Sequence, residues 1–237
     1  MEIHGSVVLV TGGNRGIGAE FVRQLKERGA RKIYLAARNI DAVHVDGVEL
    51  VTLDVTNDAQ IAAAAVQAGD VQVLINNAGV NLGETLIEGN LDVIRHEFET
   101  NFFGPLKLMR AFAPVLARNG GGAVLNVLSA LSWISSPGGT VYAAGKAAAW
   151  SATDGARIEL AGQGTQVTGL HMGMVDTDMT AGWDLAKVAP SVVVTAALDG
   201  LEVGATEVLA DDTATQVKAS LVADPAARYA DFLASLV

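Results

Sequence analysis

Short apolar runs alternate with longer amphipathic, alanine-rich stretches along most of the chain. The runs are apolar at nearly every position, which is typical of strands in a parallel sheet that helices cover on both faces. The stretches between them suit the helices that connect parallel strands. We therefore predict an α/β, three-layer fold with a doubly wound parallel sheet, formed as a single domain over residues 1–237. The predicted strands span residues 6–10, 32–36, 49–53, 71–75, 123–128 and 166–171.

The same alternation predicts the helices. Only about ten residues, 38–47, separate the second and third predicted strands, which is near the minimum for a parallel crossover. We expect at most one helical turn there. For residues 221–237 the pattern leaves two possibilities open, a terminal strand or a docking helix. The predicted helices span residues 19–28, 91–116 and 142–161, with a further one near 189–201.

Composition and charge narrow the class of protein. At 237 residues, half of them apolar, the chain is long enough to bury a substantial core. The mean hydropathy of +0.34 is high, but no uninterrupted apolar run approaches the ~18 residues of a membrane span. A net charge of −10 argues against a nucleic-acid surface, which needs clustered Lys and Arg. We expect neither a nucleic-acid nor a membrane partner.

The start of the chain and its cysteine content bear on location. The chain has no cysteine, so neither disulfides nor thiolate metal sites can form. Residues 1–4 lead almost directly into the first predicted strand and leave no room for a signal or transit peptide. We expect a cytoplasmic protein.

A glycine-rich turn, TGGNRGIG from Thr11 to Gly18, joins the first predicted strand to the first predicted helix. Glycines let the backbone approach a pyrophosphate, and the free N–H groups and dipole at a helix N-terminus favour an anion. The G-x-G-x-x-G spacing of the familiar dinucleotide fingerprint does not fit these residues. The strand–turn–helix setting nevertheless predicts a nucleotide-binding site.

The second predicted strand indicates which nucleotide is preferred. It ends Ala36-Ala37-Arg38, without the carboxylate that usually binds the adenosine ribose of NAD. Arg38 and Arg15 can instead converge on a 2′-phosphate, for which a planar fork of donors is well suited. The pair and the missing acid favour NADP(H) over NAD(H).

With these residues the chain resembles the short-chain dehydrogenase/reductase family, in its single-domain branch of about 250 residues. The resemblance extends from Val7 to about Ala210, and it implies a Rossmann-type fold and hydride transfer between a nicotinamide cofactor and a carbonyl/alcohol pair. The matching segments are the TGxxxGxG turn with Gly12, Gly16 and Gly18, then Leu53-Asp54-Val55, Asn76-Asn77-Ala78-Gly79, Asn101, Ser129, and the YxxxK pair Tyr142 and Lys146.

The resemblance also implies the cofactor site. Asp54 would lie beside the adenine, the segment 76–79 would line the pocket, and Asn101 would bind a water that completes a proton path. Lys146 would hold the hydroxyls of the nicotinamide ribose. The expected cofactor-binding residues are Gly12, Asn14, Arg15, Gly16, Ile17, Gly18, Arg38, Asp54, Val55, Asn77, Ala78, Gly79, Tyr142, Lys146, Gly173, Val175 and Thr177.

The chemistry explains the catalytic residue types independently of the family. Tyr142 and Lys146 are four residues apart on a predicted helix and so share one face. A phenol has a pKa near 10, and a nearby ammonium lowers it. Tyr142 would then be the general acid in reduction and the base in oxidation, while Ser129 would hydrogen-bond the substrate oxygen. Together with Asn101, whose role only the resemblance implies, the expected catalytic residues are Ser129, Tyr142 and Lys146.

After the sixth predicted strand the chain departs from the family pattern. Met172 replaces the usual proline of a Pro-Gly pair, while Gly173 and a following Thr177 are in place to contact the carboxamide of the nicotinamide. The missing proline loosens one turn of this loop. Gly145, inside the predicted catalytic helix, costs about 1 kcal/mol of helix stability.

The substrate would enter at the carboxyl edge of the sheet, over the fifth and sixth strands. Mostly apolar residues are expected there, which suggests a hydrophobic or aromatic carbonyl compound. The two long predicted helices also resemble those that the family packs across a two-fold axis, so we expect a homodimer or homotetramer. The expected pocket residues are Ala130, Leu131, Trp133, Met174, Met179 and Trp183.

Some other functions remain open, and others are not expected because the chain lacks the residues or the domain that they need. The four histidines are scattered without metal-ligand spacing, so we expect no metal site. A catalytically idle NADP(H)-binding sensor would be expected to lose Tyr142 or Lys146, and both are present. An epimerase or dehydratase of the longer branch needs a second domain. A β-ketoacyl-thioester reductase stays open, although the basic docking patch it would need is not clear.

Overall fold

The computed structural model describes residues 1–230, which are built around one sheet of seven parallel strands in the order β3-β2-β1-β4-β5-β6-β7. The doubly wound parallel sheet predicted from the sequence is confirmed. The chain order reverses between β1 and β4, the point at which open parallel sheets bind ligands beyond their carboxyl ends. The strands are β1 (Val7–Thr11), β2 (Lys32–Ala37), β3 (Glu49–Thr52), β4 (Val73–Asn76), β5 (Ala123–Val127), β6 (Gln166–His171) and β7 (Glu207–Leu209).

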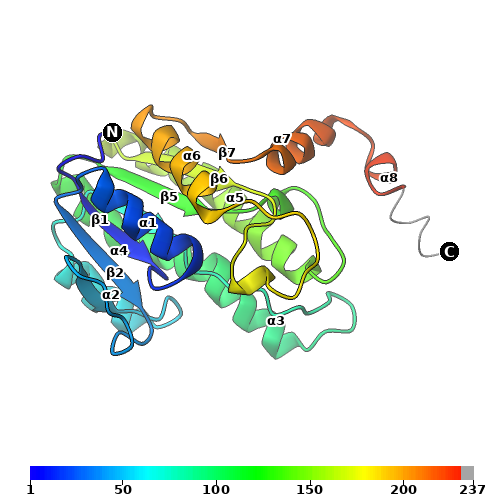
Figure 1. Cartoon of the computed structure of the whole chain (residues 1–237), viewed down its shortest axis with the longest axis horizontal. Coiled ribbons are helices and arrows are strands. Elements are labelled where there is room, and N and C mark those ends of the chain that lie inside the picture. Colours follow the sequence, from blue (N-terminus) through cyan, green and yellow to red (C-terminus); the bar gives the residue numbers. More distant parts are fainter. Residues whose placement is uncertain (231–237) are drawn as a thin grey trace.

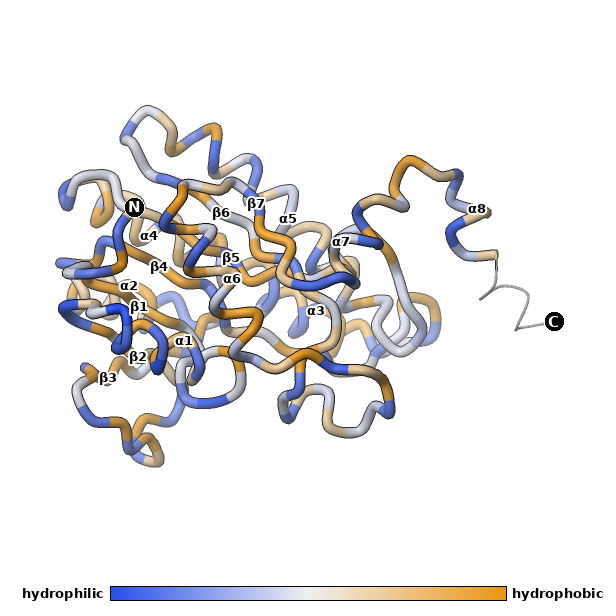
Figure 2. The backbone as a smooth tube through the Cα atoms, turned by 45° about the horizontal axis from the view of Figure 1, so that its top comes forward, coloured by the Kyte–Doolittle hydropathy of each residue, from blue (hydrophilic) through white to orange (hydrophobic). Residues whose placement is uncertain are grey.

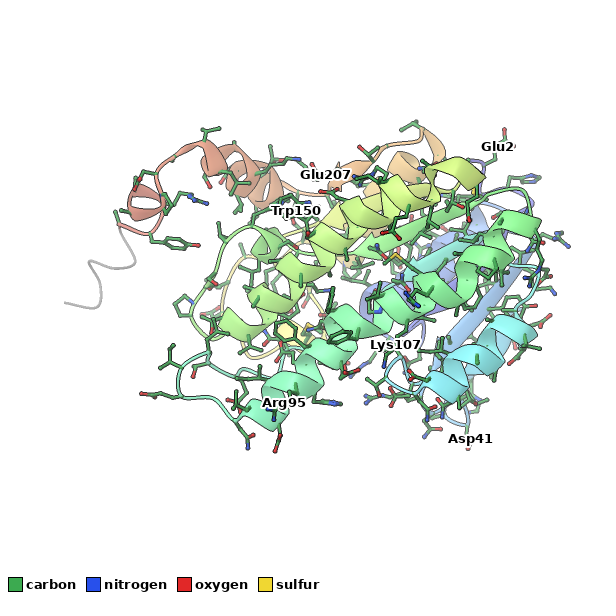
Figure 3. The ribbon with its side chains drawn as sticks, turned by 180° about the vertical axis from the view of Figure 1, so that it is seen from behind. Glu2, Asp41, Arg95, Lys107, Trp150 and Glu207 are labelled. Atoms are coloured by element: carbon green, nitrogen blue, oxygen red, sulfur yellow. The ribbon has the colours of Figure 1, made fainter. Side chains whose placement is uncertain are left out.

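Helices cover both faces of the sheet (Figure 1). Helices α1 and α6 lie on the near face in that view, and Figure 3, seen from behind, shows α5, α4 and α2 side by side on the other. The eight helices of the described residues are α1 (Gly16–Glu27), α2 (Asp58–Gln67), α3 (Leu91–Phe98), α4 (Gly104–Arg118), α5 (Thr140–Leu160), α6 (Pro190–Glu202), α7 (Asp212–Ala219) and α8 (Pro225–Arg228).

Successive residues of each central strand belong to two different cores. Val8 packs in the core with Phe21 of α1 and with α6, whereas its neighbour Leu9 packs in the core with Phe112 of α4. All four side chains are fully buried. This double coverage is the reason that the strands are apolar at consecutive positions, and the central strands are the most uniformly hydrophobic part of the tube in Figure 2.

The long helix predicted over 91–116 is present as a continuous helical segment from Leu91 to Arg118, but it is not α-helical throughout. Helix α3 ends at Phe98, a π-helical turn spans Glu99–Phe103, and α4 begins at Gly104. Gly104 lies against the loop that follows β3, where a Cβ would be 2.9 Å from Val55 Cγ2. Such π turns are rare and frequent at functional sites. Here the turn carries Asn101.

Three elements were missed by the sequence analysis: α2, β7 and α7. Helix α2 did carry a signal, because the side chain of Asn57 caps it by accepting from the amide of Gln60. Strand β7 is a three-residue edge strand with only half-buried side chains. No helix lies between β2 and β3, in agreement with the prediction for that short connection. Of the predicted tail element, α8 occupies Pro225–Arg228, and residues 231–237 lie outside the described residues.

The remaining elements agree with the predictions within a few residues. Helix α1 begins at Gly16 rather than at residue 19, because the glycine-rich turn runs directly into the first helical turn. Strand β6 has the predicted bounds. Among residues 1–230, no helix is both long enough and apolar enough to cross a bilayer.

Candidate active site

The glycine-rich turn lies at the carboxyl end of β1, and its glycines are required sterically. Gly12 and Gly16 have φ angles of +63° and +52°, in the left-handed region that favours glycine. A Cβ at Gly18 would lie 2.0 Å from the carbonyl oxygen of Gly12, so the turn closes only without a side chain there. Asn77, directly after β4, braces the turn because its side-chain Nδ2 donates to the Thr11 carbonyl at 2.8 Å.

The start of α1 fits a cofactor diphosphate. No side chain caps this helix N-terminus, so its first N–H groups and its dipole face the end of the sheet. Arg15 precedes the helix, and its Nη1 lies 3.6 Å from Asp178 Oδ2 in an exposed pair. Such a pair contributes only ~0–1 kcal/mol, so Arg15 can exchange it for a phosphate. Arg38 is exposed at the end of β2.

Asp54 lies in the loop after β3 and is held locally. Its Oδ1 accepts from the amide and hydroxyl of Thr56, at 2.9 and 2.7 Å. Partial burial acts to raise the pKa of this carboxyl, but the Thr56 hydrogen bonds and the positive charge of Arg38 hold it below its usual value. Asp54 is therefore a fixed, ionised acceptor at the adenine side expected from the sequence.

Ser129 stands where β5 ends and a 3-10 turn begins. We call residues Ser129–Trp133 the Ser129 turn. The Ser129 hydroxyl accepts from the amide of Leu131 at 3.1 Å, and its own amide donates to the Ser132 hydroxyl at 3.2 Å. This reciprocal capping fixes the side chain at the carboxyl edge of the sheet.

Tyr142 and Lys146 lie one turn apart on α5, on the face directed at the Ser129 turn. The Ser129 hydroxyl lies near the Tyr142 phenol and acts to lower its pKa. The Lys146 ammonium lies 5.5 Å from the centre of the Tyr142 ring and donates to the Val127 carbonyl at 2.7 Å. The structure thus brings together the three side chains that the sequence proposed, with Lys146 anchored to β5.

Burial shifts both of these pKa values. Burial raises the pKa of Tyr142 to about 12, with a further increase from the charge of Glu97, while the Ser129 hydroxyl acts in the opposite direction. Burial also lowers the pKa of Lys146 to about 8. The expected lowering of the Tyr142 pKa by Lys146 is absent from the protein alone. The phenol is therefore held as a proton donor at neutral pH.

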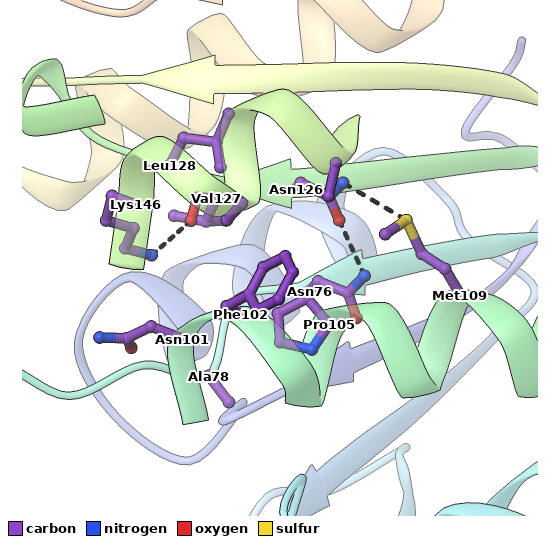
Figure 4. A pocket seen from close by; sticks show the side chains of 12 residues that line it. Asn76, Ala78, Asn101, Phe102, Pro105, Met109, Asn126, Val127, Leu128 and Lys146 are labelled. Carbon is purple, nitrogen blue, oxygen red and sulfur yellow. Dashed lines mark hydrogen bonds between the residues drawn. The ribbon is translucent and has the colours of Figure 1, made fainter. Parts of the chain in front are cut away.

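Asn101 is buried in the π-helical turn beside a small cavity. Its Oδ1 accepts from the Val80 amide at 2.9 Å, and its Nδ2 donates to the Val80 carbonyl at 2.7 Å. The cavity of about 10 Å³ is lined by Asn101 and Lys146 and by the buried Asn76, whose Oδ1 has no partner among residues 1–230 (Figure 4). That volume suits one water molecule.

The loop after β6 is held by contacts with the segment around Asp211, with Val188 and with the glycine-rich turn. Gly173 donates its amide to Asp211 Oδ2 at 2.8 Å, and a Cβ at Gly173 would lie 2.6 Å from Thr213 Cβ. Val175 pairs with Val188 in an isolated parallel bridge, and Thr177 approaches the glycine-rich turn at Gly16. Met172, in the position of the usual proline, is buried, and its carbonyl accepts from the Ala130 amide at 2.8 Å.

The expected pocket residues differ in their burial and in the segments that they contact. Ala130 is buried, and Leu131 packs toward Gly139 at the start of α5. Met179 and Trp183 lie on the exposed loop after β6, where the Trp183 ring approaches Gly138. Met174 accepts from the Val188 amide through its carbonyl at 2.9 Å. The Trp133 ring is stacked on His171.

A model of the short chain dehydrogenase family matches residues 6–187. The chain is a member of this family. A crystal structure of a short-chain dehydrogenase from Burkholderia cenocepacia J2315, in complex with NADP, is similar over 98% of this chain and 99% of that one, with a TM-score of 0.93 and 41% identity. The match supports a Rossmann-type fold and an oxidoreductase.

Two relatives by sequence have the same degree of identity. An uncharacterized oxidoreductase of Staphylococcus aureus strain USA300 is 32% identical over 209 residues, which are 82% of this chain and 90% of that protein. Dehydrogenase/reductase SDR family member 7B of Bos taurus is 32% identical over 197 residues, or 75% of this chain. The aligned region spans only 60% of the bovine protein.

Several residues around this short-chain dehydrogenase site were not found by sequence reasoning. Glu97, one helical turn before Asn101, is fully buried, and its Oε2 accepts from the Leu82 amide at 3.1 Å. Burial raises the pKa of this carboxyl, and the nearby Glu84 raises it further. His171 contacts Ser129 directly. The sequence showed His171 only as one of four scattered histidines, and a lone buried glutamate gives no spacing signal.

Proposed function

We propose that this short-chain dehydrogenase is an NADP(H)-dependent reductase of ketones or aldehydes, in which Tyr142 is the general acid in reduction and the general base in oxidation. The observation that carries the proposal is that the Ser129 hydroxyl, the Tyr142 phenol and the Lys146 ammonium lie together at the carboxyl edge of the sheet. Two hydroxyl groups that lie close together can both bind one carbonyl oxygen. One orients it, and the other protonates it.

The residues that would hold NADP(H) surround this pair. The uncapped start of α1 binds the diphosphate, Arg15 and Arg38 bind the 2′-phosphate, and Lys146 binds the ribose hydroxyls next to the nicotinamide. Gly173, Val175 and Thr177 line the carboxamide end. Support comes from the similar Burkholderia cenocepacia dehydrogenase, whose structure is a complex with NADP. When bound, the reduced cofactor supplies a hydride.

Side chains of the protein then supply the proton and orient the oxygen that receives it. The carbonyl carbon gains the hydride while the carbonyl oxygen gains the Tyr142 proton, so a ketone becomes a secondary alcohol and an aldehyde a primary one. Ser129 donates a hydrogen bond to the same oxygen and fixes its position. Because the pKa of Tyr142 is raised to about 12, the phenol is fully protonated before each reduction.

After each reduction Tyr142 must regain a proton. The small cavity lined by Asn101 and Lys146 provides the first part of a path for that proton. A water in this space would contact Lys146 and Asn101. Asn101 uses its side chain to hold the Val80 main chain, so its contribution to the route is to shape the cavity and to fix the loop after β4.

The decisive measurement is NADPH and NADH oxidation at 340 nm with acetophenone, benzaldehyde, 9,10-phenanthrenequinone and acetoacetyl-coenzyme A. We expect turnover with NADPH that is lost in Tyr142→Phe, while the Kd of NADPH stays within about threefold. Faster turnover of the thioester than of the simple carbonyls would indicate the β-ketoacyl-thioester reductase instead. Tight NADPH binding without turnover of any carbonyl would contradict the proposal and favour the sensor function.

We also propose that the protein is a cytoplasmic homodimer or homotetramer, with both cofactor and substrate sites in one domain. The support is that α4 and α5 lie side by side on one face (Figure 3), where Ile158 is 79% exposed. Light scattering is expected to give a dimer or tetramer mass, and a monomer at micromolar concentration would contradict this.

A further inference from the structure

His171, the last residue of β6, is fully buried directly behind Ser129. Its Nδ1 lies 3.0 Å from the Ser129 carbonyl oxygen. A carbonyl oxygen can only accept, so Nδ1 carries the hydrogen and donates it. The same carbonyl accepts from the Ser132 amide at 3.0 Å. His171 thus supplies one of two donors that hold the first peptide of the Ser129 turn.

The imidazole also supports the other end of that turn. It stacks on the Trp133 ring with centroids 3.9 Å apart and planes 12° apart. Trp133 in turn meets Trp150 of α5 edge-on at 6.1 Å, and Trp150 follows Lys146 by one helical turn on the same helix. One side chain of β6 therefore contacts the first and last residues of the Ser129 turn, and through two tryptophans it is linked to the helix that carries Tyr142.

We propose that His171 is a positioning residue for catalysis: its Nδ1–H and its stack on Trp133 hold the Ser129 turn so that the Ser129 hydroxyl meets the Tyr142 phenol. The proposal rests on the proposed function of Ser129 and Tyr142. His171 itself contacts neither the substrate oxygen nor the proton that Tyr142 transfers. It acts by limiting the positions that the Ser129 backbone can take.

The surroundings of the ring keep this donor in place. Glu207 Oε1 lies 3.8 Å from Nε2, which has no hydrogen-bond partner among residues 1–230. Lys218 pairs with Glu207 and lies 5.4 Å from the Trp133 ring centre. Burial lowers the pKa of His171 to about 4, the Ser129 carbonyl acts against this, and the charges of Lys218 and Lys146 lower it while Asp154 raises it. The ring is thus neutral, with one defined tautomer, throughout the working range of pH.

The first test does not need a substrate. Every amide from Leu128 to Trp133 is hydrogen-bonded, so hydrogen exchange of the segment 128–133 reports how firmly the turn is held. His171→Leu removes the donor, whereas His171→Asn keeps an N–H close to the position of Nδ1. We expect exchange to be faster by about tenfold in the Leu variant and within about threefold of wild type in the Asn variant. Equal exchange in the two variants would overturn the proposal.

The second test asks whether the effect passes through Ser129. With NADPH and whichever of the four probe carbonyls is turned over fastest, His171→Leu is expected to lower kcat by about tenfold with little change in the Kd of NADPH, and His171→Asn to restore most of it. In a Ser129→Ala background, the same His171→Leu change is expected to have almost no further effect on kcat. A tenfold loss that persists without the Ser129 hydroxyl would show a general role in folding and overturn the proposal.

The two tests also separate this inference from the proposed function. If Tyr142→Phe retains turnover, the proposed function fails, while hydrogen exchange still decides whether His171 holds the turn. If Tyr142→Phe abolishes turnover and His171→Leu does not change it, the reductase stands and the positioning role fails.

Discussion

The Lys146 ammonium is hydrogen-bonded to the Val127 carbonyl at 2.7 Å, and so it is tied to the last residue of β5, two residues before Ser129, rather than to the Tyr142 phenol. Lys146 is buried, and no carboxylate among residues 1–230 pairs with it. Lys146 also lines the small cavity beside Asn101. Under the proposed function, the two residues have different tasks: Tyr142 would hold the proton, and Lys146 would supply a positive charge that depends on pH.

The pH dependence of reduction should therefore follow Lys146. Because burial lowers the pKa of Lys146 to about 8 and raises that of Tyr142 to about 12, the proton donor persists at alkaline pH while the ammonium is lost. We expect kcat/KM for NADPH-dependent reduction to be flat from about pH 6 to 8 and to fall about tenfold per unit above that. In Lys146→Arg the activity should be lower and the alkaline fall should shift upward. A rate that rises through pH 8 would contradict this assignment.

Cofactor preference should depend on Arg15 in the glycine-rich turn and on Arg38 at the end of β2. Arg15→Ala and Arg38→Ala each remove a charged donor from the 2′-phosphate site, which is expected to raise the Kd of NADPH by about tenfold or more. The Kd of NADH should change by less than about twofold, as measured by fluorescence titration. Arg95→Ala is the matched control, since Arg95 is exposed on α3 and pairs with Asp92. Equal increases in the Kd of NADPH and of NADH would show that the two arginines do not bind the 2′-phosphate.

Two helical glycines should respond in opposite ways to alanine. In Gly18→Ala the new Cβ meets the Gly12 carbonyl oxygen at 2.0 Å, and the turn must open, so NADPH binding is expected to be lost. A Cβ at Gly155 on α5 would have nothing within 4 Å, so Gly155→Ala should retain binding and stabilise the helix by roughly 0.5–1 kcal/mol. Calorimetry of NADPH binding and urea unfolding test both. Normal binding by Gly18→Ala would show that the turn is not tightly closed.

A buried amide chain links the sheet to α5 and should contribute to stability. Asn76 Nδ2 donates to Asn126 Oδ1 at 2.8 Å, and Asn126 Nδ2 donates to Thr153 Oγ1 at 2.9 Å. Asn126→Leu leaves both partners without this contact, which is expected to lower the free energy of unfolding by about 1–3 kcal/mol. The exposed Asn39→Ala serves as control and should change it by less than about 0.5 kcal/mol. Unchanged urea unfolding of Asn126→Leu would show that these side-chain hydrogen bonds do not contribute to stability.

Buried His171 should make the fold sensitive to mild acid. Its pKa is lowered to about 4 in the folded protein, against ~6.5 when unfolded. Between these values the unfolded state binds the extra proton, so stability falls as the pH drops from about 6.5 to 4, by up to about 1.4 kcal/mol per pH unit. His171→Asn should show a flatter dependence of the urea midpoint on pH. Parallel curves for the variant and the wild type would rule out His171 as the cause.

Much of the site could be predicted because it follows from short-range patterns. The apolar runs gave the parallel strands, since only doubly covered strands are apolar at every position. Gly12, Gly16 and Gly18 stood out because a tight turn into a helix excludes side chains, as their φ angles and close contacts confirm. Tyr142 and Lys146 could be placed on one helix face from their spacing alone.

The order of residues along the chain is therefore enough to specify the parallel sheet, the position of the glycine-rich turn and the residue types of the site. What these residues touch depends on the folded chain. The contact of Asn101 with Val80, the anchoring of Lys146 on Val127 and the contact of His171 with Ser129 join segments that are far apart in the chain. Such contacts leave no periodic signal. The pKa values of Tyr142 and Lys146 depend on the same packing, because burial, which only the assembled fold creates, outweighs the local spacing of the two groups.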